Sequence, residues 1–219
     1  MKKAYEALKK NVNKSGFGPE CHGPIKGLFL AAVDELGTCE RAPLISKSDR
    51  KTQGTIFEWL CAALIQAALR VIPRRSLPVL NLDLKGELPT DFVFDLGEEK
   101  HKFHLPVKTS TRERIIQVWA HQRVLDGVYG VGRFLAMPII LTETKLDTRK
   151  REVVEICLPW QWRLYQMHIA NLWNVFYLDA PAQYLELDTK FPRIGFATLG
   201  EGLKAGGRLD GLLAAHGLW

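Results

Sequence analysis

The strongest constraint on the fold is an ordered series of hydrophobic patterns between residues 52 and 142. Residues 52–71 repeat apolar side chains at spacings of three and four, the period of one helix face, and Pro73 ends this helix. The segments that follow are, in order, strands over 77–84, 91–96 and 101–108, a helix over 111–126 closed by Gly127, and a strand over 134–142. We therefore predict an α/β fold, a central mixed sheet flanked by helices, with the element order α-β-β-β-α-β.

A chain of 219 residues is long enough for one well-buried core and short for two, so we predict a single domain over residues 1–219. Its core extends over about 52–142, and about 150–219 is a C-terminal elaboration. In the elaboration the patterns predict a helix over 160–173, strands over 174–178 and 193–199, and a loop or weak helix after residue 200. Glycines and charged residues predict turns at 85–87 and 97–100.

Charge and cysteine content narrow the class of protein. A formal net charge of +6 favours a polyanionic partner without requiring one. The sequence has no CxxC pair, and Cys21, His22 and Cys39 match no standard zinc-site spacing. The first residues lack the apolar segment of a secretory signal, and no apolar stretch approaches the ~20 residues that span a bilayer. We expect a cytoplasmic protein with reduced thiols and no membrane partner.

Two charged residues on neighbouring predicted strands are candidates for a functional site. If residues 97–100 close a tight hairpin, Asp91 falls opposite Pro106. The strand period of two then puts Asp91 and Lys108 on one face as diagonal neighbours, within ~7–8 Å at Cα. An acid so placed can hold Mg²⁺, which polarises a phosphate, and the lysine can orient or deprotonate the attacking water. The alternative is that Asp91 is a turn residue and Lys108 a strand-end charge.

The segments Pro89-Thr90-Asp91 and Pro106-Val107-Lys108, on strands in this element order, resemble the PD-(D/E)XK nuclease superfamily and, within it, the short type II restriction endonucleases. The resemblance implies a restriction-endonuclease-like core and Mg²⁺-dependent hydrolysis of double-stranded DNA at a specific short site, with Asp91 and Lys108 as catalytic residues. Pro106 departs from the superfamily pattern, which has Glu or Asp there. The alternative function is a catalytically silent DNA-binding protein, or a repair or junction nuclease, of the same fold.

Another group must then replace the carboxylate that is missing at Pro106. The resemblance implies that an acid on the first core helix can approach the strand aspartate, and Glu58 flanks the apolar stripe of that helix. We expect Glu58 to be catalytic and to bind the metal together with Asp91. The carbonyl of Val107 is a further candidate metal ligand, because hard cations accept backbone oxygen.

Two other acids have simpler explanations. Glu113 follows Ser110 by three residues, and the two form a capping box for the second helix. Asp95 lies ~13 Å along the strand from Asp91, too far to share one ion, and more simply pairs with Lys102.

The segment after Lys108 is the candidate DNA-binding surface. Hydroxyls, arginines and free amides at a helix N-terminus suit phosphate oxygens. The residues concerned are Ser110, Thr111, Arg112 and Arg114, with Gln117, His121 and Gln122 further along the helix. An ordinary capped surface helix is the alternative. His104 shares the face of Lys108 and is a candidate for contact with solvent or phosphate, whereas Arg74-Arg75 is expected to be a solvated basic surface.

Aromatic side chains are concentrated between Trp160 and Tyr184, outside the predicted nuclease core. A palindromic duplex site has two-fold symmetry, which an enzyme of one domain matches most simply as a C2 dimer. We therefore expect a homodimer with this aromatic segment as its interface. Extra core packing within one subunit is the alternative.

Overall fold

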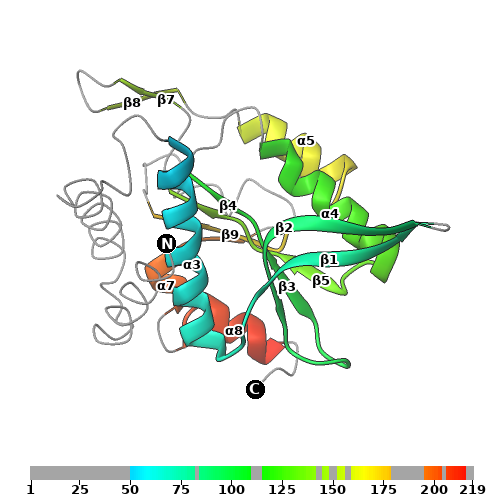
Figure 1. Ribbon diagram of the computed structural model, residues 1–219. Coiled ribbons are helices and arrows are strands. Elements are labelled where there is room, and N and C mark those ends of the chain that lie inside the picture. Colours follow the sequence, from blue (N-terminus) through cyan, green and yellow to red (C-terminus); the bar gives the residue numbers. More distant parts are fainter. Residues whose placement is uncertain are drawn as a thin grey trace, which may run out of the picture.

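The computed structural model describes residues 50–81, 84–109, 115–141, 145–147, 152–155, 159–178, 195–203 and 206–215, and Figure 1 shows how their elements are arranged. The helices are α3 (Arg50–Leu69), α4 (Ile116–Tyr129), α5 (Pro159–His168), α7 (Leu199–Leu203) and α8 (Arg208–Ala215). The strands are β1 (Arg74–Asn81), β2 (Leu84–Asp95), β3 (Lys102–Leu105), β4 (Val107–Lys108), β5 (Phe134–Ala136), β6 (Ile139–Ile140), β7 (Lys145–Asp147), β8 (Glu152–Glu155), β9 (Asn174–Tyr177) and β10 (Gly195–Thr198).

The predicted order α-β-β-β-α-β is present from α3 to β6. The second helix, however, continues through Gly127 to Tyr129 and ends at Gly130. The turn predicted at 85–87 is wrong, because these residues lie inside β2, with Lys85 opposite Leu80 and Gly86 opposite Val79 of β1. Pairing with β1 satisfies the backbone there and outweighs the low strand propensity of glycine and glutamate. The tail forms two short helices, α7 and α8. None of the described helices is long and apolar enough to cross a lipid bilayer.

The main sheet consists of two four-stranded parts, in the orders β1-β2-β3-β5 and β10-β9-β6-β4. They divide where two strand runs are interrupted, the first at Pro106 and the second at Met137 and Pro138. Backbone hydrogen bonds continue across the division, from Met137 N to His104 O and from Ile139 N to Pro106 O, each 2.8 Å long. The sheet is therefore mixed, antiparallel from β1 to β3 and parallel from there to β10.

The predicted register between the second and third strands is confirmed. Asp95 faces Lys102, as a hairpin turn at 97–100 requires. Gly97 enters this turn at φ 124°, a conformation that glycine adopts without a steric penalty, and its N–H donates to Asp95 Oδ1 at 3.1 Å. A slip of one residue would turn every side chain of the strand to the other face. The register thus decides that Asp91 and Lys108 share a face.

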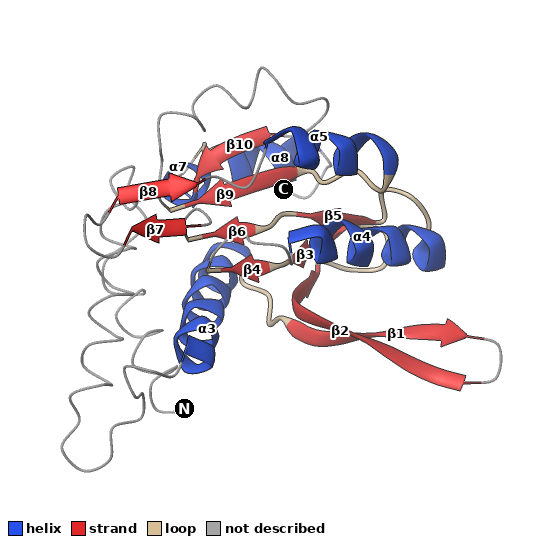
Figure 2. Cartoon of the chain, turned by 90° about the horizontal axis from the view of Figure 1, so that it is seen from above, coloured by secondary structure: helices blue, strands red, loops and turns tan. Residues whose placement is uncertain are grey.

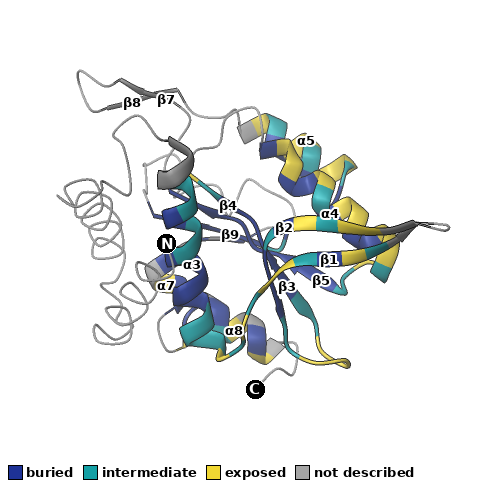
Figure 3. Cartoon of the chain, in the orientation of Figure 1, coloured by how far each residue is buried: buried dark blue, intermediate teal, exposed yellow. Residues whose placement is uncertain are grey.

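Helices cover both faces of the sheet, and alternate strand residues enter two cores. The core on the side of α3, α7 and α8 includes Phe92, Phe103, Leu105, Val107, Ile139 and Phe176. The core on the side of α4 and α5 includes Trp119, Ala136, Ile140, Trp162, Val175 and Tyr177. Figure 3 shows the buried strands between these helices. The sheet therefore separates the two helix layers.

The outer part of the β1–β2 hairpin projects away from the helices (Figure 2). The hydroxyl of Tyr129, the last residue of α4, donates a hydrogen bond to the carbonyl of Pro78 in β1. Leu77 and Val93 of the hairpin also pack with Leu125 of α4. The hairpin is thus attached to α4 at its base, which fixes β2 relative to that helix.

The aromatic segment is divided between the core and the surface. Trp162, Phe176 and Tyr177 are buried within the subunit, so extra core packing accounts for them. Trp160 and Met167 of α5 are more than half exposed, at 55% and 57%. Residues 179–194 lie outside the described part of the chain. Use of the segment as an interface stays a prediction.

Candidate active site

The candidate site lies where the ladder between β2 and the β3–β4 run ends. The last backbone pair joins Phe92 to Leu105, and the next residue, Pro106, has no N–H to donate. Beyond this point the Asp91 side chain takes over, because its Oδ2 accepts a hydrogen bond from the N–H of Val107 at 2.7 Å. The expected distortion at Pro106 is therefore present, and the carboxylate of Asp91 takes the place of the missing backbone partner.

A bulge in β2 also sets the direction of Asp91. Arg74 of β1 pairs with Val93 and Ser76 pairs with Pro89, so Arg75 alone faces the three residues 90–92. The extra residues bend β2 at this point, which is how bulges commonly aim a side chain near a functional site. Pro89 contributes to the irregularity, since it cannot donate to β1. Asp91 thus lies where neither neighbouring strand pairs with it regularly.

Asp91 and Lys108 form an ion pair, with Lys108 Nζ 2.9 Å from Asp91 Oδ2. Both side chains are partly accessible, at 22% for Asp91 and 26% for Lys108. The structure therefore brings together the two residues that the register predicted as neighbours. A charge pair that solvent still reaches can exchange partners with a substrate or an ion.

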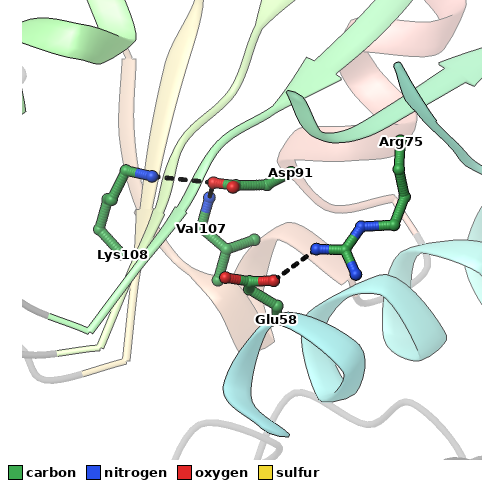
Figure 4. A network of polar contacts seen from close by, with 5 residues as sticks. All are labelled: Glu58, Arg75, Asp91, Val107 and Lys108. Carbon is green, nitrogen blue, oxygen red and sulfur yellow. Dashed lines mark hydrogen bonds and ion pairs between the residues drawn. The ribbon is translucent and has the colours of Figure 1, made fainter. Parts of the chain in front are cut away.

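Glu58 reaches the same place from α3. Burial and the negative charge of Asp91 raise the pKa of Glu58, while Arg75 and Lys108 lower it. Its Oε2 accepts a hydrogen bond from Arg75 Nη2 at 2.8 Å, and 23% of its side chain is exposed. Figure 4 shows its carboxylate beside Val107, the residue whose N–H meets Asp91. The structure thus brings the predicted helix acid to the strand aspartate.

The carbonyl of Val107 points to the same centre. The carbonyls of Pro106 and Lys108 both accept hydrogen bonds from the β5–β6 run, at 2.8 and 3.0 Å. Because successive carbonyls of a strand point to opposite edges, the Val107 carbonyl faces the β2 side, where its own N–H meets Asp91. This geometry leaves the Val107 oxygen on the side of Asp91.

The donors of this centre suit a hard cation. Two carboxylates and a backbone carbonyl are oxygen ligands of the kind that Mg²⁺ prefers. Burial, and then the charge of Asp91, raise the pKa of Glu58, and a cation between the two carboxylates would offset both effects. Among the described residues, no three His, Cys, Asp or Glu side chains converge as a metal cluster. Any site here therefore depends on backbone, water or substrate oxygen in addition to Asp91 and Glu58.

The other candidate acids are elsewhere. Asp95 accepts from Lys102 Nζ at 2.5 Å, which confirms the predicted pair. Glu113 lies outside the described residues, as do Ser110, Thr111, Arg112 and Arg114 of the candidate DNA-binding segment. The capping box predicted for Ser110 and Glu113 is wrong, because α4 begins at Ile116 and its N-cap is Ile115, without a side-chain hydrogen bond. Cys21, His22 and Cys39 are also outside them.

The two glutamines predicted on α4 differ in exposure. Gln117 is exposed. Gln122 is buried and donates to Asp126 Oδ1 and to the Phe134 carbonyl, at 2.8 and 2.9 Å. The prediction that Gln122 contacts DNA is therefore wrong, because its amide joins α4 to β5 inside the protein.

Two histidines, His104 on β3 and His121 on α4, lie near enough to the charged pair to sense its charges. His104 is fully buried, and neither of its ring nitrogens has a hydrogen-bond partner within the described chain. The prediction that His104 contacts solvent or phosphate is therefore wrong, since α4 covers this strand residue. Its ring centre lies 6.1 Å from that of His121. Burial and then the charge of Lys108 lower the pKa of His121, so this residue senses the same centre.

Arg75 is the member of this site that the sequence did not predict. It pairs with Glu58 and its guanidinium lies 5.2 Å from the centre of the Phe92 ring. Its position depends on the bulge opposite it, which no sequence pattern predicts. The sequence showed only that Arg75 lies on the strand before that of Asp91.

Comparison with known proteins identifies the fold. No family model and no curated protein matches the sequence. A crystal structure of the Type IIP restriction endonuclease Kpn2I is similar at a TM-score of 0.61 and 24% identity, over 92% of this chain and 68% of that one. A complex of the restriction endonuclease PspGI with substrate DNA is similar at a TM-score of 0.57 and 11% identity, over 90% of this chain and 88% of that one. The chain has the mixed α/β fold of type II restriction endonucleases.

Proposed function

We propose that this protein is a type II restriction endonuclease that hydrolyses phosphodiester bonds in both strands of double-stranded DNA at a specific short site, with Mg²⁺. The observation that carries the proposal is the Asp91–Lys108 pair at the interrupted ladder, with Glu58 beside it. The fold of the two similar endonucleases supports it, and one of these structures is a complex with substrate DNA.

Three oxygen donors would hold the metal. These are the carboxylates of Asp91 and Glu58 and the carbonyl of Val107. Mg²⁺ bound there would polarise the scissile phosphate and stabilise the charge that develops on it. Glu58 thereby takes the place of the carboxylate that Pro106 lacks.

Lys108 has the second role in the reaction. Its ammonium group is next to Asp91 and partly exposed, so it can donate a hydrogen bond to the attacking water and to a phosphate oxygen. Asp91 holds Lys108 in this position through the 2.9 Å contact. The two residues would therefore orient the attacking water.

DNA would approach from the side of Lys108 and the start of α4. Ser110, Thr111, Arg112 and Arg114 supply hydroxyls and charges for the phosphates, as the sequence predicts. Gln117, exposed on the first turns of α4, and His121, close to Lys108, extend this surface. Such an enzyme would act in the cytoplasm, where it meets DNA.

Incubation of the purified protein with supercoiled and linear plasmid DNA, with Mg²⁺ and with EDTA, tests the proposal. Discrete fragments that require Mg²⁺ are the expected result. A smear would indicate a nuclease without site specificity. Intact DNA that is nevertheless retarded in a gel would replace the proposal with a catalytically silent DNA-binding protein.

We also propose that the enzyme is a homodimer, so that two Asp91–Lys108 pairs address opposite strands. The outer face of α5 supports this, because Trp160, Leu164 and Met167 follow one helical stripe and are 55%, 43% and 57% exposed. Light scattering at micromolar protein, with and without DNA, is expected to give twice the mass of the 24.8 kDa chain. A monomer under both conditions would contradict the dimer, and replacement of Trp160 and Met167 by Glu should produce that monomer.

A further inference from the structure

Arg75 is the charged side chain of the site that has no part in the proposed reaction. It comes from β1, whereas the metal donors come from α3, β2 and β4. Its guanidinium is held at two points, by Glu58 Oε2 at 2.8 Å and by the face of Phe92 at 5.2 Å from the ring centre. Phe92 is itself buried, so the ring is a fixed support.

We propose that Arg75 is a positioning residue that orients the carboxylate of Glu58 toward the cation. This inference rests on the proposed function. Arg75 binds Oε2, and the other oxygen of Glu58 lies on the side of Val107 and Asp91 (Figure 4). The hydrogen bond therefore decides which oxygen faces the metal donors. Carboxylate ligands of metals are commonly fixed in this way by a second hydrogen-bonding group.

The bulge in β2 makes this arrangement possible. Arg75 stands alone opposite residues 90–92, so the same irregularity that aims Asp91 also leaves space for the arginine side chain. An arginine suits the position because its planar group stacks on an aromatic ring while its edge donates to a carboxylate. A lysine would keep the charge but would lose both the stacking and the fixed direction of the donor.

Charge and orientation predict opposite effects on cation binding. Arg75 is a positive charge near the metal donors, so its removal by itself should strengthen cation binding. Its removal also frees the Glu58 side chain to rotate, which should weaken cation binding by about 10-fold or more if the bond positions the carboxylate. The sign of the change therefore separates a positioning residue from a bystander.

The experiment measures binding of Mn²⁺ alone, without DNA, from the electron paramagnetic resonance signal of the free ion. The wild-type protein is compared with Arg75→Gln, Arg75→Lys, Glu58→Gln and the double variant Glu58→Gln/Arg75→Gln. Arg74→Gln is the matched control, because Arg74 is exposed on the same strand and carries the same charge. Thermal unfolding checks that each variant is folded, and Arg75→Lys decides the question if Arg75→Gln does not fold.

We expect both Arg75 variants to bind Mn²⁺ about 10-fold or more weakly and Arg74→Gln to bind it no more weakly than wild type. In the Glu58→Gln background, Arg75→Gln should cause no further weakening. Arg75 variants that bind as tightly as Arg74→Gln would overturn the inference alone. Further weakening in the Glu58→Gln background would also overturn it, because Arg75 would then act without Glu58. A wild-type protein that binds no Mn²⁺ would remove the metal centre, and the proposed function would fall together with the inference.

Discussion

Two aspartate–lysine pairs join β2 to the β3–β4 run, one to β3 and one to β4, yet their surroundings differ. Asp95 and Lys102 are direct neighbours in a regular ladder and are 2.5 Å apart. Asp91 and Lys108 are 2.9 Å apart and lie beyond the end of that ladder, where Asp91 also accepts the Val107 N–H. The regular pair stands beside an intact ladder and also holds the Gly97 turn, whereas the irregular pair replaces missing ladder contacts.

The neighbours of the two pairs differ as well. Burial would raise the pKa of Asp95, but hydrogen bonds from Lys102 and from the Gly97 amide outweigh it and lower this pKa. At the other pair, Glu58 on α3 and His121 on α4 both sense the charges of Asp91 and Lys108. An ion pair alone therefore does not identify a site. The Asp91–Lys108 pair differs because it lies at a break in the sheet and has a second acid and groups from both helix layers near it.

The largest expected difference is catalytic. Asp91→Ala and Lys108→Ala should each lower the rate of plasmid cleavage by about 10²–10⁴-fold, because each removes a group that acts on the reacting atoms. Asp95→Ala and Lys102→Ala are the matched controls and should cleave at nearly the wild-type rate. Initial rates of supercoiled plasmid loss measure this, with circular dichroism to verify folding. Equal losses at both pairs would erase the distinction between them.

The second difference concerns the extra acid. Glu58→Gln should lower cleavage about 10–100-fold, and added Mg²⁺ should recover part of the loss, because a metal donor is weakened. Glu113→Gln should cost less activity, because Glu113 is not among the proposed metal donors. Cleavage rates over a series of Mg²⁺ concentrations compare the two variants. If Glu58→Gln behaves like wild type, the absent carboxylate at Pro106 has no replacement on α3.

The sequence predicted the regular parts of this comparison well. Alternation in Phe92–Leu96 and a turn at 97–100 were enough for the register, and the register gave both the Asp95–Lys102 and the Asp91–Lys108 neighbours. The helical period of α3 likewise put Glu58 at the margin of the core. These inferences rest on local periodicity, which a single sequence contains.

The irregular parts could not be predicted in the same way. Arg75 enters the site only because residues 90–92 bulge, and His104 is buried only because α4 packs over its face of the sheet. Both facts depend on tertiary packing and not on spacing in the sequence. The turn at 85–87 failed for a related reason, because pairing with β1 outweighed local propensity.

His104 lies on the face between the two pairs and should make the protein sensitive to acid. Burial, and then the neighbouring His121, lower the pKa of His104 from 6.5 to about 3. The folded state then binds fewer protons than the unfolded state, so stability is complete above pH ~6.5 and falls as the pH drops toward ~3, by up to about 1.4 kcal/mol per pH unit. Urea unfolding from pH 7 to pH 4 should show this slope, and His104→Leu should flatten it. An unchanged slope in the variant would assign the acid sensitivity to other groups.

The smallest expected effect is the contribution of the regular pair to stability. A double-mutant cycle of Asp95→Asn and Lys102→Met, measured by urea unfolding at pH 7, should give a coupling energy of about 0.2–1 kcal/mol, because both side chains remain partly exposed. Since the pKa of Asp95 is lowered on folding, this contribution is complete above its ordinary value of 3.8 and is lost as the pH falls through the lower folded value. The same cycle at pH 3 should therefore give a smaller coupling than at pH 7. A coupling of about 3 kcal/mol, the scale of a broken buried pair, would mean that Asp95–Lys102 is a major stabilising contact of the ladder. The two pairs would then differ only in the surroundings of Asp91.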